Sequence, residues 1–161
     1  MRGDMKRYDR IIFLSTTNTL LGPIAEVIYR KNSSDWMPKG ISRGLVVLFE
    51  EPIHPKCNQL LTQNGFPMTA HGQSKQLVQE DIGENSLVIT MTFSEKVKFT
   101  EDFNTLENVY TLGEFVGVDT DIIDPSGAED NKYQECFEEL AMRINKLIHK
   151  IEKLYWDEEN S

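Results

Sequence analysis

A short polar loop carries the arrangement in this chain that is best suited to chemistry. Residues 10–14 form an apolar run typical of a buried strand, and residues 23–30 have the composition of a helix that begins at Pro23. A helix N-terminus presents unpaired backbone N–H groups and the positive end of the helix dipole, so the loop between these segments could hold an anion through its backbone. We therefore expect a ligand-binding loop made of Ser15, Thr16, Thr17, Asn18, Thr19, Leu20, Leu21 and Gly22.

Six further segments follow this loop in a defined order. They are S-R-G-L at 42–45, E-P-I-H-P at 51–55, N-G-F-P-M-T-A-H at 64–71, L-V-I-T-M-T at 87–92, V-Y-T-L-G-E-F at 109–115 and D-P-S-G at 124–127. With the first loop, they resemble in the same order the segments of the low-molecular-weight protein tyrosine phosphatases. The resemblance covers roughly residues 10 to 154, and the shared order makes it specific although each segment alone is weak.

The resemblance also shows what the loop lacks. The family carries C-x5-R followed by Ser or Thr and then Pro, and Ser15 stands at the place of the nucleophilic Cys, Leu21 at that of the phosphate-holding Arg and Gly22 at that of the hydroxyl residue. A helix N-terminus favours a thiolate at the Cys position, whereas a serine needs an adjacent base to become an alkoxide, and no His lies nearby in sequence. Leu21 offers apolar surface where Arg would grip phosphate with two hydrogen bonds.

Other residues of these segments have both a functional and a structural interpretation. The resemblance implies that Asp124 is the acid that protonates the leaving group, but Asp-Pro-Ser-Gly is also an ordinary turn, and Ser126 stands where the family has an aromatic wall. Asn18 matches a structural asparagine whose amide fixes the loop. Ser15, Thr16 and Thr17 could alternatively cap the following helix.

Several remaining residues have weaker functional signals. Trp36 and Phe49 either flank the cleft, where the family carries its variable loops, or pack within surface loops. The three histidines are too dispersed for a metal site, and His71 matches a hydrogen-bonded structural histidine of the family. Neither cysteine is expected to be a nucleophile, and nothing in the sequence implies a cofactor. The three histidines are His54, His71 and His149, and the two cysteines are Cys57 and Cys136.

Length and charge limit the classes of partner. A chain of 161 residues is the size of one domain, with residues 1–9 and 156–161 expected to be flexible ends. The net charge of −9 argues against nucleic acid and for a basic or small ligand. Two cysteines without a C-x-x-C spacing, a charged N-terminus and the absence of a long apolar run predict a cytoplasmic protein with no membrane segment.

Apolar runs alternate with amphipathic stretches along the chain. Strands are predicted at 10–14, 40–45, 86–90 and 108–111, with helices after Pro23, Pro55 and Ser94 and from about residue 132 onward. This alternation indicates an α/β fold with a parallel sheet covered on both faces. The resemblance implies a three-layer sandwich, strand order 2-1-3-4, like that of phosphotyrosine protein phosphatase I. An apolar stripe on the last helix, from Tyr133 to Leu154, is expected to pack on the sheet rather than form a coiled coil.

Three hypotheses about function follow. We favour an inactive, phosphatase-like protein, a pseudophosphatase, that binds an anion, a phosphorylated protein or another protein partner, with a homodimer also open. The alternative is a phosphoester hydrolase in which Ser15 and Asp124 act in an altered site. A third possibility, a serine-for-cysteine trap made from an active enzyme, conflicts with Leu21, because a trap would keep the Arg that holds substrate.

Overall fold

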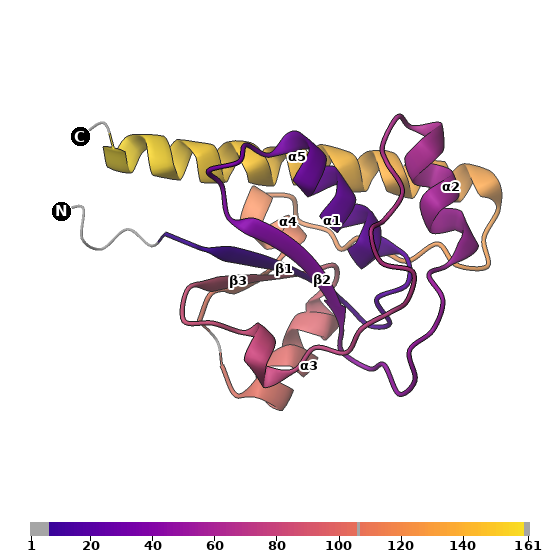
Figure 1. Ribbon diagram of the computed structural model, residues 1–161, viewed down its shortest axis with the longest axis horizontal. Coiled ribbons are helices and arrows are strands. Elements are labelled where there is room, and N and C mark those ends of the chain that lie inside the picture. Colours follow the sequence, from indigo (N-terminus) through magenta and orange to yellow (C-terminus); the bar gives the residue numbers. More distant parts are fainter. Residues whose placement is uncertain (1–6, 106, 160–161) are drawn as a thin grey trace.

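The computed structural model of the chain describes residues 7–105 and 107–159. Its centre is a four-stranded parallel sheet in the order β2-β1-β3-β4 (Figure 1). The strands are β1 Arg10–Ser15, β2 Lys39–Gly44, β3 Ser86–Thr90 and β4 Val109–Thr111. The predicted fold class and strand order are therefore confirmed, and β3 has the bounds that the sequence predicted.

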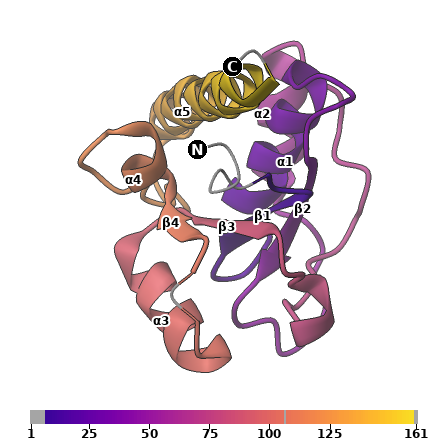
Figure 2. The same ribbon diagram turned by 90° about the vertical axis from the view of Figure 1, so that its left-hand side faces the viewer.

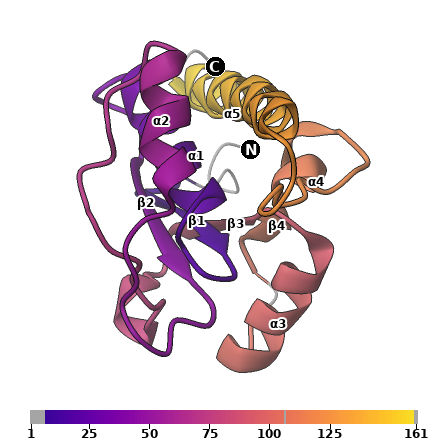
Figure 3. The ribbon, with the colours of Figure 1, turned by 90° about the vertical axis from the view of Figure 1, so that its right-hand side faces the viewer.

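Helices cover both faces of this sheet. They are α1 Leu21–Asn32, α2 Pro55–Gln63, α3 Phe93–Phe103, α4 Leu112–Val116 and α5 Asp130–Glu159, with a 3-10 helix, η2, at Gln79–Asp81. Figures 2 and 3 show α1, α2, α4 and α5 on one face and α3 on the other. Alternate residues of β1 serve the two layers, since Ile11 and Phe13 join the larger core and Ile12 and Leu14 the smaller one.

The long C-terminal helix packs as its apolar stripe predicted. Six stripe residues are buried in the larger core and Leu154 is half-buried: Tyr133, Phe137, Leu140, Ile144, Leu147 and Ile151. Its main neighbours are α1 and α4, so it forms part of the helical layer over the sheet. The helix continues to Glu159, beyond the point where the apolar spacing ends. Of the expected flexible ends, residues 1–6 and 160–161 lie outside the described residues.

Two predicted helix starts were wrong by small amounts, and one helix was not predicted. Helix α1 begins at Leu21 rather than at Pro23, because proline is tolerated in the first turn, where its missing N–H has no helical acceptor. Helix α3 begins at Phe93, with the Thr92 side chain capping it. The short α4 directly follows β4 and has the same type of cap, which Thr111 and Glu114 form together.

Candidate functional site

The predicted loop lies where β1 ends and α1 begins, at the carboxyl edge of the sheet. Ser15 is the last residue of β1, and Leu21 and Gly22 are the first residues of α1, so the connecting loop itself spans residues 16–20. A small cavity of about 170 Å³ opens beside Ser15. Residues of the loop, of the turn after β3, of α3 and of the segment after α4 line it: Ser15, Thr16, Thr17, Leu20, Leu21, Met91, Thr92, Glu95, Ile122 and Asp124. The structure therefore brings Ser15 and Asp124 to one cavity, as the resemblance implied.

Asn18 fixes the turn of the loop, as predicted. Its backbone has a positive φ of 59°, a conformation that asparagine tolerates better than most residues. The buried side chain accepts a hydrogen bond from the backbone N–H of Lys75 at 2.8 Å, and the Asn18 N–H donates to Ser15 Oγ at 3.2 Å. The amide nitrogen Nδ2 of Asn18 is buried with no hydrogen-bond partner.

The hydroxyl groups of the loop do not cap α1, so that alternative prediction is wrong. The N-cap residue is Leu20, and no side chain accepts a hydrogen bond from the first turn. Ser15 Oγ instead accepts from Asn18, and Thr16 Oγ1 donates to Glu95 Oε2 at 2.8 Å. The uncapped N-terminus of α1 leaves backbone N–H groups available to a ligand.

The segment that follows β2 is hydrogen-bonded to the loop at both of its ends. The backbone N–H groups of Leu45 and Val46 donate to the carbonyls of Ser15 and Thr16, each at 2.9 Å. Farther along, the N–H of His54 donates to the carbonyl of Thr19, also at 2.9 Å. We call residues 45–54, whose two ends are hydrogen-bonded to the loop, the rim.

Glu95 is a site residue that the sequence analysis missed. It is only 9% exposed, and besides the Thr16 hydroxyl it accepts hydrogen bonds from the N–H groups of Met91 and Thr92 at 3.1 and 3.0 Å. The spacing Thr92-x-x-Glu95 directly after a predicted strand is a capping-box signal and could have located the carboxylate. It could not have shown that this carboxylate also holds the loop.

Asp124 is both a turn residue and a residue that lines the cavity. Its Oδ1 accepts hydrogen bonds from the N–H and the hydroxyl of Ser126, at 2.8 and 2.5 Å, and the turn closes with Ala128 N–H on the Pro125 carbonyl. Its side chain is exposed. The turn interpretation and the cleft interpretation of this motif are therefore compatible.

The charges around the cavity are unsuited to phosphate. Its charged lining residues, Glu95 and Asp124, are both acidic, and no Lys, Arg or His is among the described residues that line it. A unit charge about 4 Å from a like charge is repelled by about 1 kcal/mol in water and by about 4 kcal/mol near a protein surface. The positive end of a helix dipole stabilises a nearby anion by typically about 0.3–1 kcal/mol. The N-terminus of α1 alone therefore offsets only part of the repulsion that a phosphate would meet in this cavity.

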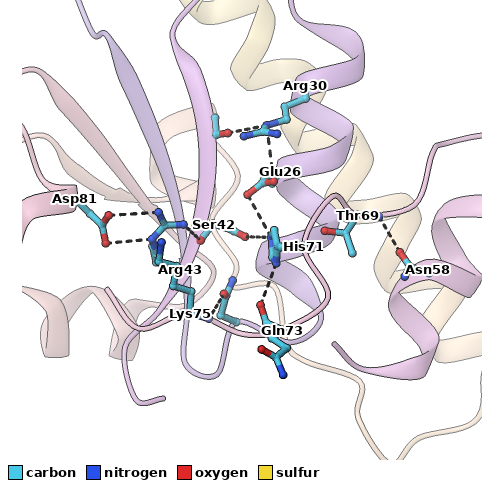
Figure 4. A network of polar contacts seen from close by, with 12 residues as sticks. Glu26, Arg30, Ser42, Arg43, Asn58, Thr69, His71, Gln73, Lys75 and Asp81 are labelled. Atoms are coloured by element: carbon cyan, nitrogen blue, oxygen red, sulfur yellow. Dashed lines mark hydrogen bonds and ion pairs between the residues drawn. The ribbon is translucent and has the colours of Figure 1, made fainter. Parts of the chain in front are cut away.

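A second polar network joins α1, β2 and residues 71–75, the segment whose Lys75 N–H is held by Asn18 of the loop (Figure 4). Buried Glu26 of α1 lies 3.7 Å from the His71 ring and 3.7 Å from Arg30, and His71 Nε2 lies 3.3 Å from Ser42 Oγ of β2. Burial alone would raise the pKa of the Glu26 carboxyl, but His71 and Arg30 outweigh it and lower that pKa. The hydrogen bond to Glu26 raises the pKa of His71. His71 is thus a hydrogen-bonded structural residue, as predicted.

The cysteines and Trp36 do not contribute to the cavity. Burial, with the charge of Glu26, raises the pKa of Cys57 to about 12, and burial, with the charges of Asp124 and Glu139, raises that of Cys136 to about 11. Both stay thiols at neutral pH and are poor nucleophiles. Trp36 packs on Tyr155 of α5 and lines a separate hollow of about 680 Å³, so the prediction that it flanks the cleft was wrong.

Comparison with known proteins agrees with this geometry. The family model of the low molecular weight phosphotyrosine protein phosphatases matches residues 10–156. The chain belongs to this family. The low molecular weight protein-tyrosine-phosphatase PtpB of Staphylococcus haemolyticus is 32% identical over 138 residues, which are 86% of this chain and 96% of the relative. PtpB of Staphylococcus aureus is 28% identical over the same shares.

Solved structures of family members superpose over nearly the whole chain. The low molecular weight protein tyrosine phosphatase of T. tengcongensis has a TM-score of 0.80 and 31% identity, covering 88% of this chain and 98% of its own. The YwlE arginine phosphatase of Geobacillus stearothermophilus has a TM-score of 0.84 and 28% identity, covering 92% and 96%. A cysteine-to-serine mutant of a YwlE arginine phosphatase with a phosphorylated active-site serine has a TM-score of 0.79 and 26% identity, covering 89% and 96%.

Two features are absent from the part of the chain that the structure describes. No described helix is long and apolar enough to cross a membrane. Within the same residues, no group of three or more His, Cys, Asp or Glu side chains is placed to hold a metal ion.

Proposed function

We propose that this protein is a pseudophosphatase, a family member without catalytic activity that uses the cleft at the end of β1 to bind a ligand or a protein. One observation carries the proposal: the described cavity beside Ser15 contains neither a thiol nor a cation. Its relatives are named tyrosine and arginine phosphatases. A phosphoryl-transfer site needs a nucleophile and a positive group that neutralises the transferred phosphoryl oxygens. Leu21 supplies no positive group, and the Ser15 hydroxyl is a weak nucleophile unless a base takes its proton.

The geometry of Ser15 supports the same proposal. Its hydroxyl accepts a hydrogen bond from the Asn18 N–H, and no histidine or lysine lines the cavity among the described residues. The carboxylate of Glu95 already accepts from Thr16 and from two backbone N–H groups. Ser15 therefore has no evident base that would take its proton. A cytoplasmic location and the absence of nucleic acid among its partners remain predictions.

A second candidate function has one observation in its favour. In the YwlE mutant the active-site serine is phosphorylated, so a serine at this place in the fold can carry a phosphoryl group. Ser15 Oγ would then form a bond to the substrate phosphorus and lose its proton to solvent, while Asp124 protonates the leaving group as its bond to phosphorus breaks. Water would then release phosphate from the serine. We place this altered hydrolase second, because Leu21 leaves the transferred phosphoryl group without a cationic partner.

The deciding experiment measures hydrolysis of p-nitrophenyl phosphate and of a phosphoarginine peptide from acid to neutral pH. The protein is compared with Ser15→Ala and Asp124→Asn, and mass spectrometry checks Ser15 for a phosphoryl group after incubation. We expect turnover equal to buffer in all three proteins and an unmodified Ser15. Turnover that both substitutions abolish would establish the altered hydrolase instead.

A further inference from the structure

The hollow that Trp36 lines, of about 680 Å³, lies at the opposite edge of the sheet from the cavity beside Ser15. Arg7 precedes β1 and Trp36 precedes β2, and the other lining residues come from the last turns of α5. Figure 1 shows this end of α5 near the start of β1, where the Tyr155 hydroxyl donates to the Tyr8 carbonyl at 2.6 Å. The two cavities share none of their described lining residues.

Three aromatic side chains line this hollow. Both tryptophans of the chain are among them, and Trp36 and Trp156 are 55% and 66% exposed. The third is the buried Tyr155, whose ring lies 5.6 Å from that of Trp36. Exposed tryptophan rings in a concave surface offer flat faces on which another planar ring can stack. The hollow is therefore suited to an aromatic ligand.

The charges of the hollow differ from those of the acidic candidate cleft. Arg7 and Lys153 are positive, and the negative member of the described lining is Glu152, which lies 3.5 Å from the His149 ring. The Arg7 guanidinium lies 4.6 Å from the centre of the Tyr155 ring, so a cation and an aromatic face meet at one place. An anion entering here would meet an excess of positive lining residues, although the net charge of the chain is −9.

We propose that this hollow binds a nucleoside monophosphate, a planar aromatic ring that carries an anionic group. The base would stack on the exposed tryptophan rings, and the phosphate would pair with Arg7 and Lys153. The volume of about 680 Å³ is within the range of about 300–1,000 Å³ that is typical of small-ligand sites. The ligand is a free nucleotide rather than a nucleic acid. Because this is a second site, the inference does not depend on whether the protein hydrolyses phosphoesters.

The test measures the tryptophan fluorescence of the full chain with four probes. Adenosine monophosphate (AMP) carries both the ring and the anion, adenosine the ring alone, ribose phosphate the anion alone, and phenyl phosphate an anion on a smaller ring. Because both tryptophans line the hollow, a bound ligand changes their emission directly. We expect saturable quenching by AMP, at least about tenfold weaker binding of adenosine and phenyl phosphate, and no response to ribose phosphate. Calorimetry of the same mixtures distinguishes binding from absorption of light by the base.

Matched variants separate stacking from charge. Trp156→Ala should weaken AMP binding about five- to 100-fold, the effect typical of losing one stacked base, and Trp36 remains as the reporter. Met142→Ala, which truncates an exposed apolar residue elsewhere on α5, should leave binding unchanged. Lys153→Gln should weaken binding about two- to fivefold, as expected for one exposed ion pair. Lys146→Gln, which removes an exposed lysine of α5 that does not line the hollow, should have no effect.

Each other outcome overturns the proposal. No saturable response to AMP would mean that the hollow is not a nucleotide site. Equal affinity for adenosine would assign it to a neutral aromatic ligand, and equal affinity for phenyl phosphate to aryl phosphates in general. Equal weakening by Lys153→Gln and Lys146→Gln would mean that general charge attracts the phosphate. Emission that changes with protein concentration alone would indicate a second copy over the hollow, and AMP binding that appears only after removal of residues 1–6 would assign the hollow to the chain's own N-terminal segment.

Discussion

The two sides of the loop after β1 differ in how completely their polar groups are matched. Behind the loop, Glu26 pairs with His71 and Arg30, and Asn18 holds the Lys75 N–H. In front of it, Ser15 and Leu21 face a cavity whose charged groups are two carboxylates. The groups behind the loop hold its conformation, and the groups that line the cavity in front of it determine its chemistry. Under the proposed non-catalytic role, this chain has the geometry of a phosphatase loop without its reaction.

The sharpest test of this comparison restores a nucleophile and a cation at the cavity and leaves the groups behind the loop unchanged. Ser15→Cys combined with Leu21→Arg should give measurable hydrolysis of p-nitrophenyl phosphate that Asp124→Asn reduces. Each single change should be at least about 100-fold slower than the pair, because removing one charge-stabilising donor costs about that factor and the two groups act as a unit.

The folded state of the combined variant is the control for this prediction. Leu21 is 5% exposed, so an arginine there must extend its head group into the cavity toward Glu95 and Asp124. If the variant keeps the stability of the parent chain and remains inactive, the two sides of the loop are not independent. The front would then have a geometry that the supporting network alone does not provide.

Substitutions behind the loop should instead lower the free energy of unfolding. Asn18→Ala removes the acceptor of the Lys75 N–H and places alanine at φ 59°, so we expect a loss of about 2–4 kcal/mol in the free energy of unfolding by urea. Asn18→Gly loses the same hydrogen bond but tolerates the backbone conformation. It should be about 1 kcal/mol more stable than the alanine variant. Equal losses would show that the positive φ carries no cost here.

The sequence predicted the groups behind the loop better than the contacts around the cavity. The alternation of apolar runs and helices predicts the parallel sheet, and Asn18 and His71 were assigned their structural roles from the family segments. The contacts of Glu95 with Thr16 and of the rim with Ser15 could not be predicted, because they join positions far apart in the chain. Backbone N–H donors such as those of Leu45 and His54 are also the same for every residue type except proline, so they leave no mark in the sequence.

The ionised pair behind the loop should make stability depend on pH. The raised pKa of His71 means that its contribution is fully present below its ordinary value of 6.5 and is lost as the pH rises through its folded pKa. The lowered pKa of Glu26 works in the opposite direction, and its contribution is lost only in acid. Arg30 also faces Glu26, and Arg43 slightly opposes protonation of His71.

We therefore expect the free energy of unfolding to fall by about 0.5–1 kcal/mol more in the parent chain than in His71→Gln between about pH 6 and about pH 8.5. Urea unfolding at both pH values measures this difference. His149→Gln is the matched control, since His149 is an exposed residue whose ring lies 3.5 Å from Glu152. A pH response that His149→Gln removes and His71→Gln retains would contradict the assignment.

The two sides of the loop meet at Gly22. A Cβ added there would lie 3.0 Å from Ser15 Oγ and 3.4 Å from Asn18 Nδ2, the buried donor without a partner. Gly22→Ser brings a hydroxyl within reach of that donor, whereas Gly22→Ala adds the same crowding without an acceptor. The serine variant should therefore be more stable than the alanine variant by about 0.5–1.5 kcal/mol, the net contribution of one hydrogen bond. Thermal unfolding of the pair measures it, and equal stabilities would mean that the unpaired Nδ2 is satisfied by water. A more stable serine variant would show that the groups behind the loop can accommodate and bind a hydroxyl at position 22.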